Sequence, residues 1–178
     1  MIGQEIPLGI EWWPFEVHPE TPPDGRLLTD MFPGTIFEKF YRKLARQSGV
    51  PDLPFGRAER LDNSGMALAS FLFARETAPA TVVDRFHDAL FRAHFVEEQN
   101  ISQVKTVLAI ATACGLDAPG LETSLQTRKY FRELDDCGNE ARQKGINSVP
   151  TFIVNGRHRL VGTQPLEGFR EFLQKING

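Results

Sequence analysis

An α/β fold is the class that this sequence predicts, because three kinds of pattern follow one another along the chain. An aromatic and β-branched run comes first, helical periodicity fills the middle, and the last third combines two extended runs with an amphipathic one. The 178 residues, 41% of them hydrophobic, give room for one well-cored domain or for a small domain with a sizeable insertion. The predicted order of elements is therefore strand, helices, hairpin, helix.

The first expected element is a strand over residues 8–17, Leu-Gly-Ile-Glu-Trp-Trp-Pro-Phe-Glu-Val. Pro14 can end its ladder because proline has no backbone donor. Trp12 and Trp13 are neighbours, so in a strand they point to opposite faces and at most one of them can line a groove. Residues 19–26 are rich in proline and turn residues, which predicts an extended surface loop.

Helical periodicity occupies about residues 35–141. Apolar residues recur at intervals of three and four in five stretches, and a glycine follows three of these stretches where a helix would stop. The predicted helices cover residues 36–44, 66–75, 82–96, 104–113 and a stretch from near Tyr130 toward Gly145. No internal repeat is visible, which favours a helical bundle over a solenoid.

The last third predicts a β-hairpin and a closing helix. Two extended runs, residues 149–154 and 157–161, are joined by Asn155-Gly156, a dipeptide whose positive φ values suit a type I′ turn. Pro165 then fits a first helical turn, where a missing donor is tolerated. One apolar face defines the helix that follows: Leu166, Phe169, Leu173 and Ile176.

Charge and hydropathy exclude several kinds of partner. Twenty lysines and arginines against 23 acidic residues give a net charge of −3 without a basic block, so nucleic acid is not an expected partner. The longest apolar stretch, residues 107–115, is far shorter than the roughly 20 residues that span a bilayer, and no membrane association is expected. The first residues lack the features of a secretory signal, which predicts a cytoplasmic chain.

Generic catalytic signatures are absent from the sequence: there is no phosphate-binding loop, dinucleotide fingerprint, nucleophile elbow or Cys-x-x-Cys pair. His87 and His94 lie two helical turns apart, which places them on one face with Glu98 beyond them. Tight metal binding usually needs three or four convergent ligands. We therefore assign neither a metal site nor a cofactor.

Neither of the two cysteines is expected to be reactive. Cys114 lies at the end of a predicted helix, where the dipole disfavours a thiolate, and Cys137 lies beside Asp135 and Asp136, which should raise its pKa. A disulfide between the two would require their Cα atoms to approach within about 7 Å. Free thiols are the favoured interpretation, and the disulfide stays open.

The most informative local motif is Ser148-Val149-Pro150-Thr151-Phe152, which places a proline at the head of a strand that should be interior. A cis bond between Val149 and Pro150 would turn the backbone of Val149 outward, where it could pair with an extended peptide. A trans proline that opens an edge strand is the alternative, and local propensity favours it.

The whole chain resembles the DsbA family of thioredoxin-fold proteins, in particular its cytoplasmic FrnE-like branch. The likeness covers nearly the full length in the same order, and its motifs are specific as a set rather than singly. They are Trp13-Pro14-Phe15-Glu16-Val17, Pro22-Pro23-Asp24-Gly25, Leu90-Phe91-Arg92-Ala93-His94-Phe95, Gly115-Leu116-Asp117, Glu140-Ala141, the run from Gly145 to Phe152, Asn155-Gly156 and Gly162-Thr163-Gln164-Pro165.

This resemblance implies a thioredoxin-like fold of the DsbA type with a large helical insertion. Residues 1–34 and 142–178 would form an incomplete thioredoxin-like domain, and residues 35–141 the insertion. In this family the proline is cis and helps to hold the substrate, which implies a polypeptide or a glutathione-like thiol as partner. The substrate-binding residues implied are Val149, Pro150, Thr151, Thr163 and Gln164.

The sequence departs from the family at its start. Family members begin with a strand and a helix whose amino end carries Cys-x-x-Cys, whereas this sequence begins at what looks like the second strand. No catalytic residue can therefore be assigned, and the chain is expected to be redox-silent. Loss of a central strand would leave exposed sheet edges and an apolar groove, so we expect a closed-up sheet, a strand donated by another chain, as in a homodimer, or a truncated product.

Two alternatives to an oxidoreductase without its redox motif stay open. Glutathione-dependent 2-hydroxychromene-2-carboxylate isomerases are similar to DsbA in having a helical insertion and a Val-Pro pair, although the motif around Thr163 looks more like the FrnE type. A non-catalytic peptide-binding module on a thioredoxin fold is the second alternative.

Overall fold

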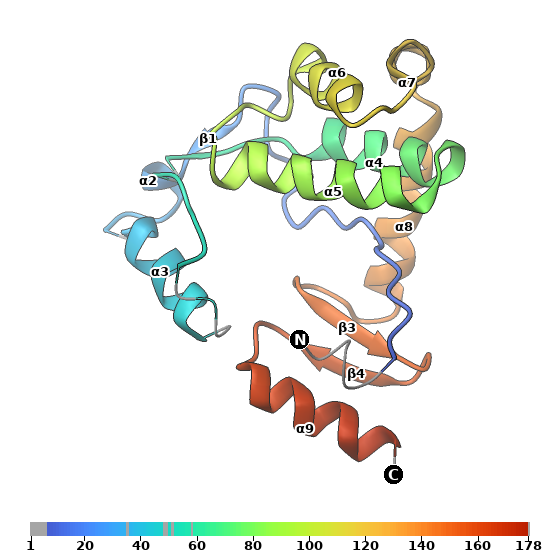
Figure 1. The fold of residues 1–178 in the computed structure, drawn as a ribbon. Coiled ribbons are helices and arrows are strands. Elements are labelled where there is room, and N and C mark those ends of the chain that lie inside the picture. Colours follow the sequence, from blue (N-terminus) through green and yellow to red (C-terminus); the bar gives the residue numbers. More distant parts are fainter. Residues whose placement is uncertain (1–6, 35, 48–49, 51, 58, 178) are drawn as a thin grey trace.

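The computed structural model describes residues 7–177 except positions 35, 48–49, 51 and 58. Within these residues it contains eight helices and two antiparallel two-stranded sheets, arranged as in Figure 1. In chain order the elements are β1 (Arg26–Leu27), α2 (Leu28–Met31), α3 (Phe37–Gln47), β2 (Arg60–Leu61), α4 (Gly65–Thr77), α5 (Ala80–Phe95), α6 (Val104–Ala113), α7 (Ala118–Gln126), α8 (Lys129–Gln143), β3 (Thr151–Val154), β4 (His158–Val161) and α9 (Leu166–Asn177).

Five helices, α4 to α8, enclose the largest apolar core. Helix α4 is apolar on nearly every side and packs against α5, α6, α7 and α8, as expected of a helix buried in a bundle. Leu72 of α4, Phe86 of α5 and Leu121 of α7 are completely or almost completely buried in this cluster. The helices predicted over residues 36–44, 66–75, 82–96 and 104–113 and from Tyr130 are all present, with ends shifted by a few residues.

Helix α7 was not predicted from the sequence. Asp117 begins it as an N-cap whose carboxylate accepts a hydrogen bond from the Gly120 amide at 3.0 Å, and Pro119 occupies its first turn. These two residues were the available signal. The helix is only nine residues long, so its apolar face contains too few residues to stand out as a periodic pattern.

The predicted strand over residues 8–17 is wrong. The described part of this segment contains no strand, and Trp12 and Trp13 are both about half exposed. A strand needs a neighbour with free backbone groups, and the sheets of the described residues pair only β1 with β2 and β3 with β4. Side chains hold the segment instead, since the ring of Trp12 stacks on His87 with centroids 4.7 Å apart.

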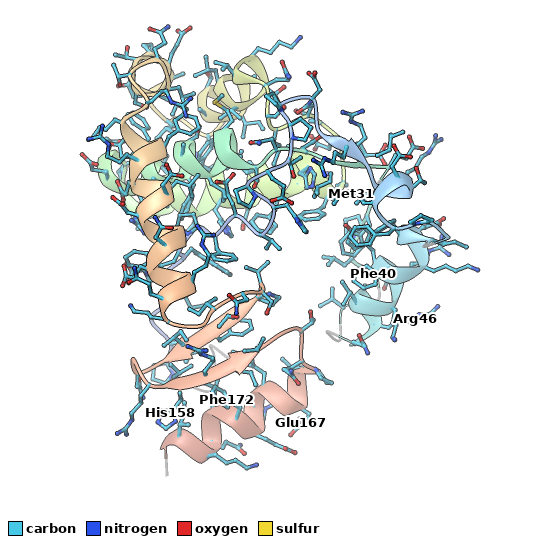
Figure 2. All side chains as sticks on the ribbon, turned by 180° about the vertical axis from the view of Figure 1, so that it is seen from behind. Met31, Phe40, Arg46, His158, Glu167 and Phe172 are labelled. Carbon is cyan, nitrogen blue, oxygen red and sulfur yellow. The ribbon has the colours of Figure 1, made fainter. Side chains whose placement is uncertain are left out.

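The predicted hairpin and closing helix are confirmed. Asn155 and Gly156 have φ values of 51° and 70°, and the register pairs Val154 with His158. Helix α9 covers one face of the hairpin, where Phe152 and Phe169 meet edge to face at 4.9 Å. Figure 2 shows His158 and Phe172 in this part of the molecule, and Phe40 on α3 at a distance from it.

In the part of the chain that the structure describes, none of the helices has the length and apolar character that a membrane span requires.

Candidate functional site

The segment that leads to Pro150 is positioned by the end of α8. Gly145 has a φ of 69°, its amide donates to the Arg142 carbonyl at 2.9 Å, and the Ile146 amide donates to the Ala141 carbonyl at 2.9 Å. This is the hydrogen-bond pattern of a Schellman motif, which ends a helix and turns the chain away from it. The chain then reaches β3 through an exposed bend at residues 148–150.

Val149 and Pro150 form an exposed corner at the start of β3. The peptide bond between them is cis, as the resemblance implies, and the side chain of Val149 is 53% exposed. The Pro150 carbonyl accepts a hydrogen bond from the Gly162 amide at 2.8 Å. This bond joins the corner to the loop that follows β4.

One edge of β3 is open beside this corner. Backbone groups of successive residues in a strand point to opposite sides, and the carbonyl of Pro150 points toward β4. The backbone groups of Thr151 and Ile153 therefore point away from β4. No other strand pairs with that edge within the residues described. Main-chain hydrogen bonds are consequently available there to an extended guest.

The structure brings the remaining predicted site residues to the same end of the hairpin. Thr151 pairs with Val161, two residues before Thr163, and its hydroxyl donates to the Ser148 carbonyl at 2.7 Å. Gln164 donates through Nε2 to the Val161 carbonyl at 3.2 Å, and Thr163 is exposed. Their juxtaposition agrees with what the family resemblance implies, while their role in binding stays a prediction.

Both cysteines are free, Cys114 buried and Cys137 half-buried. Burial raises the pKa of the Cys114 thiol, and the nearby Arg85 opposes this only in part. Burial is also the largest cause that raises the pKa of Cys137, and neighbouring carboxylates add to it against the effect of Arg75. Both thiols are therefore free and have raised pKa values, and the main cause is burial rather than the helix dipole or the Asp135 and Asp136 carboxylates that the sequence indicated.

These raised pKa values predict slow thiol chemistry. In the folded protein both thiols should react with Ellman's reagent more slowly than free cysteine at the same mildly alkaline pH, because the thiolate is the reacting form. Cys137 should react before Cys114 because it is less buried. The variants Cys114→Ser and Cys137→Ser each keep a single thiol, so the reaction rate of each cysteine can be measured separately. The same variants unfolded in urea serve as the control. A thiol that reacts faster when folded than when unfolded would contradict the assignment.

His87 contacts aromatic rings, and His94 contacts a carboxylate. His87 lies between rings, 4.7 Å from Trp12 and 4.8 Å from Phe91. His94 Nδ1 lies 3.3 Å from the carboxylate of Asp62, whose side chain is nearly buried. No group of three His, Cys, Asp or Glu side chains converges within the described residues. Sequence reasoning missed the pair of His94 and Asp62, which are 32 positions apart.

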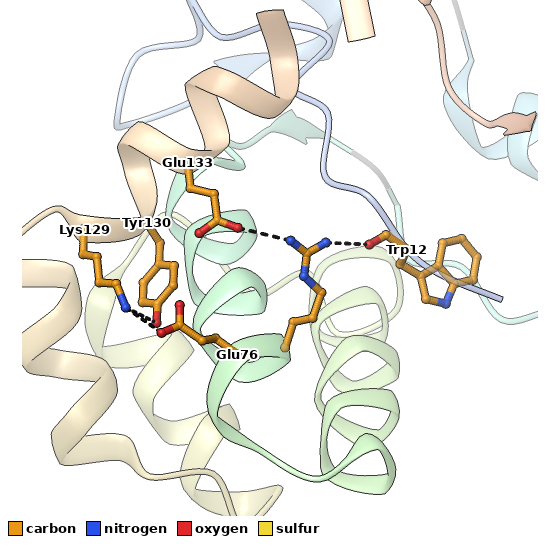
Figure 3. Close-up of polar contacts among 6 residues, drawn as sticks. Trp12, Glu76, Lys129, Tyr130 and Glu133 are labelled. Carbon is orange, nitrogen blue, oxygen red and sulfur yellow. Dashed lines mark hydrogen bonds and ion pairs between the residues drawn. The ribbon is translucent and has the colours of Figure 1, made fainter. Parts of the chain in front are cut away.

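Arg75 connects the N-terminal segment to two helices, a role that no local motif indicates. Its guanidinium lies 3.1 Å from the Glu133 carboxylate and 3.4 Å from the Trp12 carbonyl, and 4.7 Å from the centre of the Trp13 ring. Figure 3 shows the first two contacts beside a separate cluster in which Lys129 bridges Glu76 and Tyr130. Arg75 thus holds the segment without any backbone ladder.

The family model of the DsbA-like thioredoxin domain matches residues 7–174. The chain is 27% identical over 146 residues to YwbO, an uncharacterized protein of Bacillus subtilis, a match that covers 82% of this chain and 71% of YwbO.

Two solved structures show the same fold. One is described as a probable DsbA oxidoreductase from Streptomyces coelicolor, with a TM-score of 0.76, 22% identity, and 93% of this chain and 74% of the other covered. The other is the cytosolic disulfide reductase DsbM from Pseudomonas aeruginosa, with a TM-score of 0.57, 18% identity, and 80% and 78% covered.

Proposed function

Because the chain belongs to the family of DsbA-like thioredoxin domains, we propose that it serves thiol–disulfide exchange by holding an extended polypeptide substrate at Val149 and Pro150. The observation that carries this proposal is the exposed corner at these residues beside the open edge of β3. The backbone groups of Thr151 would pair with the guest strand, and Thr163 and Gln164 would form the rim.

The proposal assigns substrate binding, and not the redox step, to these 178 residues. Exchange requires a thiolate that attacks a disulfide sulfur, and the raised pKa values of Cys114 and Cys137 make both poor candidates. The sequence contains no other cysteine. A Cys-x-x-Cys pair would have to come from polypeptide other than these residues. The FrnE-like branch and a cytoplasmic setting belong to the same proposal. The likeness to a cytosolic disulfide reductase supports the cytoplasmic setting.

Two measurements on the purified chain test the proposal. Insulin reduction by dithiothreitol should proceed at the uncatalysed rate, with or without prior alkylation of the chain. An unfolded, cysteine-containing peptide labelled with a fluorophore should nevertheless bind, as measured by anisotropy. Alkylation-sensitive turnover would contradict the assignment of the redox step, and absence of peptide binding would contradict the binding role. Glutathione binding without peptide binding would favour the isomerase-like alternative.

A substitution at the corner localises the binding. Val149→Asp should weaken binding of the peptide about tenfold, which corresponds to about 1.4 kcal/mol of binding free energy, because the substitution places a charge where an apolar guest would pack. Its side chain is exposed, so the fold should tolerate the change. Val17→Asp is the matched control, since Val17 is also exposed but lies on the N-terminal segment. Equal losses in the two variants would place the peptide elsewhere.

A further inference from the structure

A separate pocket of about 360 Å³ lies where the N-terminal segment meets α4 and α8. This volume is near the lower end of the range of small-molecule sites, about 300–1,000 Å³. The pocket shares no residue with the hairpin site. Its lining includes Glu16, Asn63, Met66, Arg128, Leu134 and Asp135.

The proline-rich wall of this pocket is fixed at two points. The Asn63 side chain donates to the Thr21 carbonyl at 2.5 Å and accepts from the Gly65 amide at 3.0 Å, which joins the loop to the start of α4. The Ser102 hydroxyl donates to the Pro23 carbonyl at 2.8 Å. A loop held at both points, with its prolines restricting φ, is formed before any ligand arrives.

Charges of both signs line the pocket without neutralising one another. Glu16 and Asp135 are the anions, and Arg128 is the cation, held with its guanidinium 4.4 Å from the centre of the Phe131 ring. Within the described part of the chain, no ion pair or hydrogen bond joins these three side chains. Burial and then the charge of Asp135 raise the pKa of Glu16, with Arg142 acting in the opposite direction.

Gly65 leaves space for the Glu16 carboxylate. A Cβ at position 65 would lie only 3.0 Å from Glu16 Oε1. The carboxylate therefore sits directly against the start of α4, on the same pocket wall as the Asn63 amide. The remaining lining is apolar and is provided by Met66, Leu134 and the prolines.

We propose that this pocket binds a free amino acid with an apolar side chain. Its ammonium group would lie by Glu16 and Asp135, its carboxylate by Arg128, and its side chain against the apolar wall. Two adjacent carboxylates favour a cation, and a guanidinium favours a carboxylate. A ligand that carries both groups would meet charges of both signs in the lining of this pocket. This activity goes beyond the proposed function and would persist if the hairpin bound no peptide.

The ligand side of the test uses three probes and the unmodified chain. L-Phenylalanine carries both charges, phenethylamine only the cation, and 3-phenylpropionate only the anion. Isothermal titration calorimetry should show L-phenylalanine binding at least about tenfold more tightly than either probe, since each charged contact contributes roughly 1.4 kcal/mol. Equal affinities of the three probes, or no heat with L-phenylalanine at millimolar concentration, would overturn the proposal.

Substitutions in the protein test which pocket residue binds each charged group of the ligand. Asp135→Asn should lower the affinity for L-phenylalanine and for phenethylamine about tenfold and leave the affinity for 3-phenylpropionate unchanged. Arg128→Gln should lower the affinity for L-phenylalanine and for 3-phenylpropionate and leave the affinity for phenethylamine unchanged. Asp136→Asn and Arg132→Gln are matched controls, because both residues are exposed on α8 and neither lines the pocket. Losses as large in the controls as in the pocket variants would show that the overall charge of α8, rather than the pocket, attracts the probes.

Discussion

Phe86→Ala should lower the free energy of unfolding by about 3–5 kcal/mol. The Phe86 side chain is 0% exposed within the cluster that α4 to α8 enclose, so its removal loses transfer free energy and leaves a cavity. A loss of this size is a large fraction of the roughly 5–15 kcal/mol that stabilises a typical domain. Urea denaturation followed by far-ultraviolet circular dichroism measures it directly.

The matched control for this variant lies on the same helix. Phe91 also belongs to α5, but its side chain is 53% exposed. Phe91→Ala should therefore cost less than about 1 kcal/mol while removing the same number of atoms. If the two variants lost equal stability, the face of α5 that carries Phe86 would not be the one packed in the core.

The elements that the sequence predicted well are those whose pattern reports packing. Apolar residues at intervals of three and four mark the buried face of a helix, so α4, α5 and α6 could be located to within a few residues. The hairpin followed from Asn155-Gly156, because few dipeptides adopt two positive φ values. In both cases the signal is contained in one short segment.

Whether residues 8–17 form a strand could not be decided from that segment alone. A run of aromatic and β-branched residues shows that a segment suits an extended backbone, but it does not show whether a neighbouring strand offers free backbone groups. The segment is held by the guanidinium of Arg75 and by stacking on His87, both of which lie more than 60 positions away. Such contacts depend on tertiary packing alone.

The two candidate sites also differ in this respect, since one lies within a single hairpin and the other depends on tertiary packing. The family resemblance implied Val149 and Thr163 as parts of one site, and the register of a single hairpin brings them to the same end. Glu16 and Arg128, in contrast, lie more than 100 positions apart, and no motif contains both of them. Only the packing of α8 against the N-terminal segment and α4 brings them to one pocket.

Leu173→Ala should release the hairpin and α9 while leaving the helical core folded. Leu173 is 1% exposed and lies one turn after Phe169, which packs on Phe152 of β3. Truncation of a buried leucine costs about 2–5 kcal/mol. The large apolar cluster contains residues of α4 to α8 and none of α9, so this loss should fall on the smaller unit.

Hydrogen exchange measured by mass spectrometry separates local from global unfolding. In Leu173→Ala, amides of β3, β4 and α9 should exchange much faster, by a factor of about 30 or more for a loss of 2 kcal/mol, while those of α4 and α5 keep their protection. Leu166→Ala, on the same helix at 45% exposure, should change little. Faster exchange throughout the chain would mean that β3, β4 and α9 unfold together with α4 to α8. Peptide binding at Val149 would then depend on the stability of the core. If the hairpin and α9 instead unfold independently, the corner at Val149 and Pro150 can be lost while the pocket between the N-terminal segment, α4 and α8 remains folded.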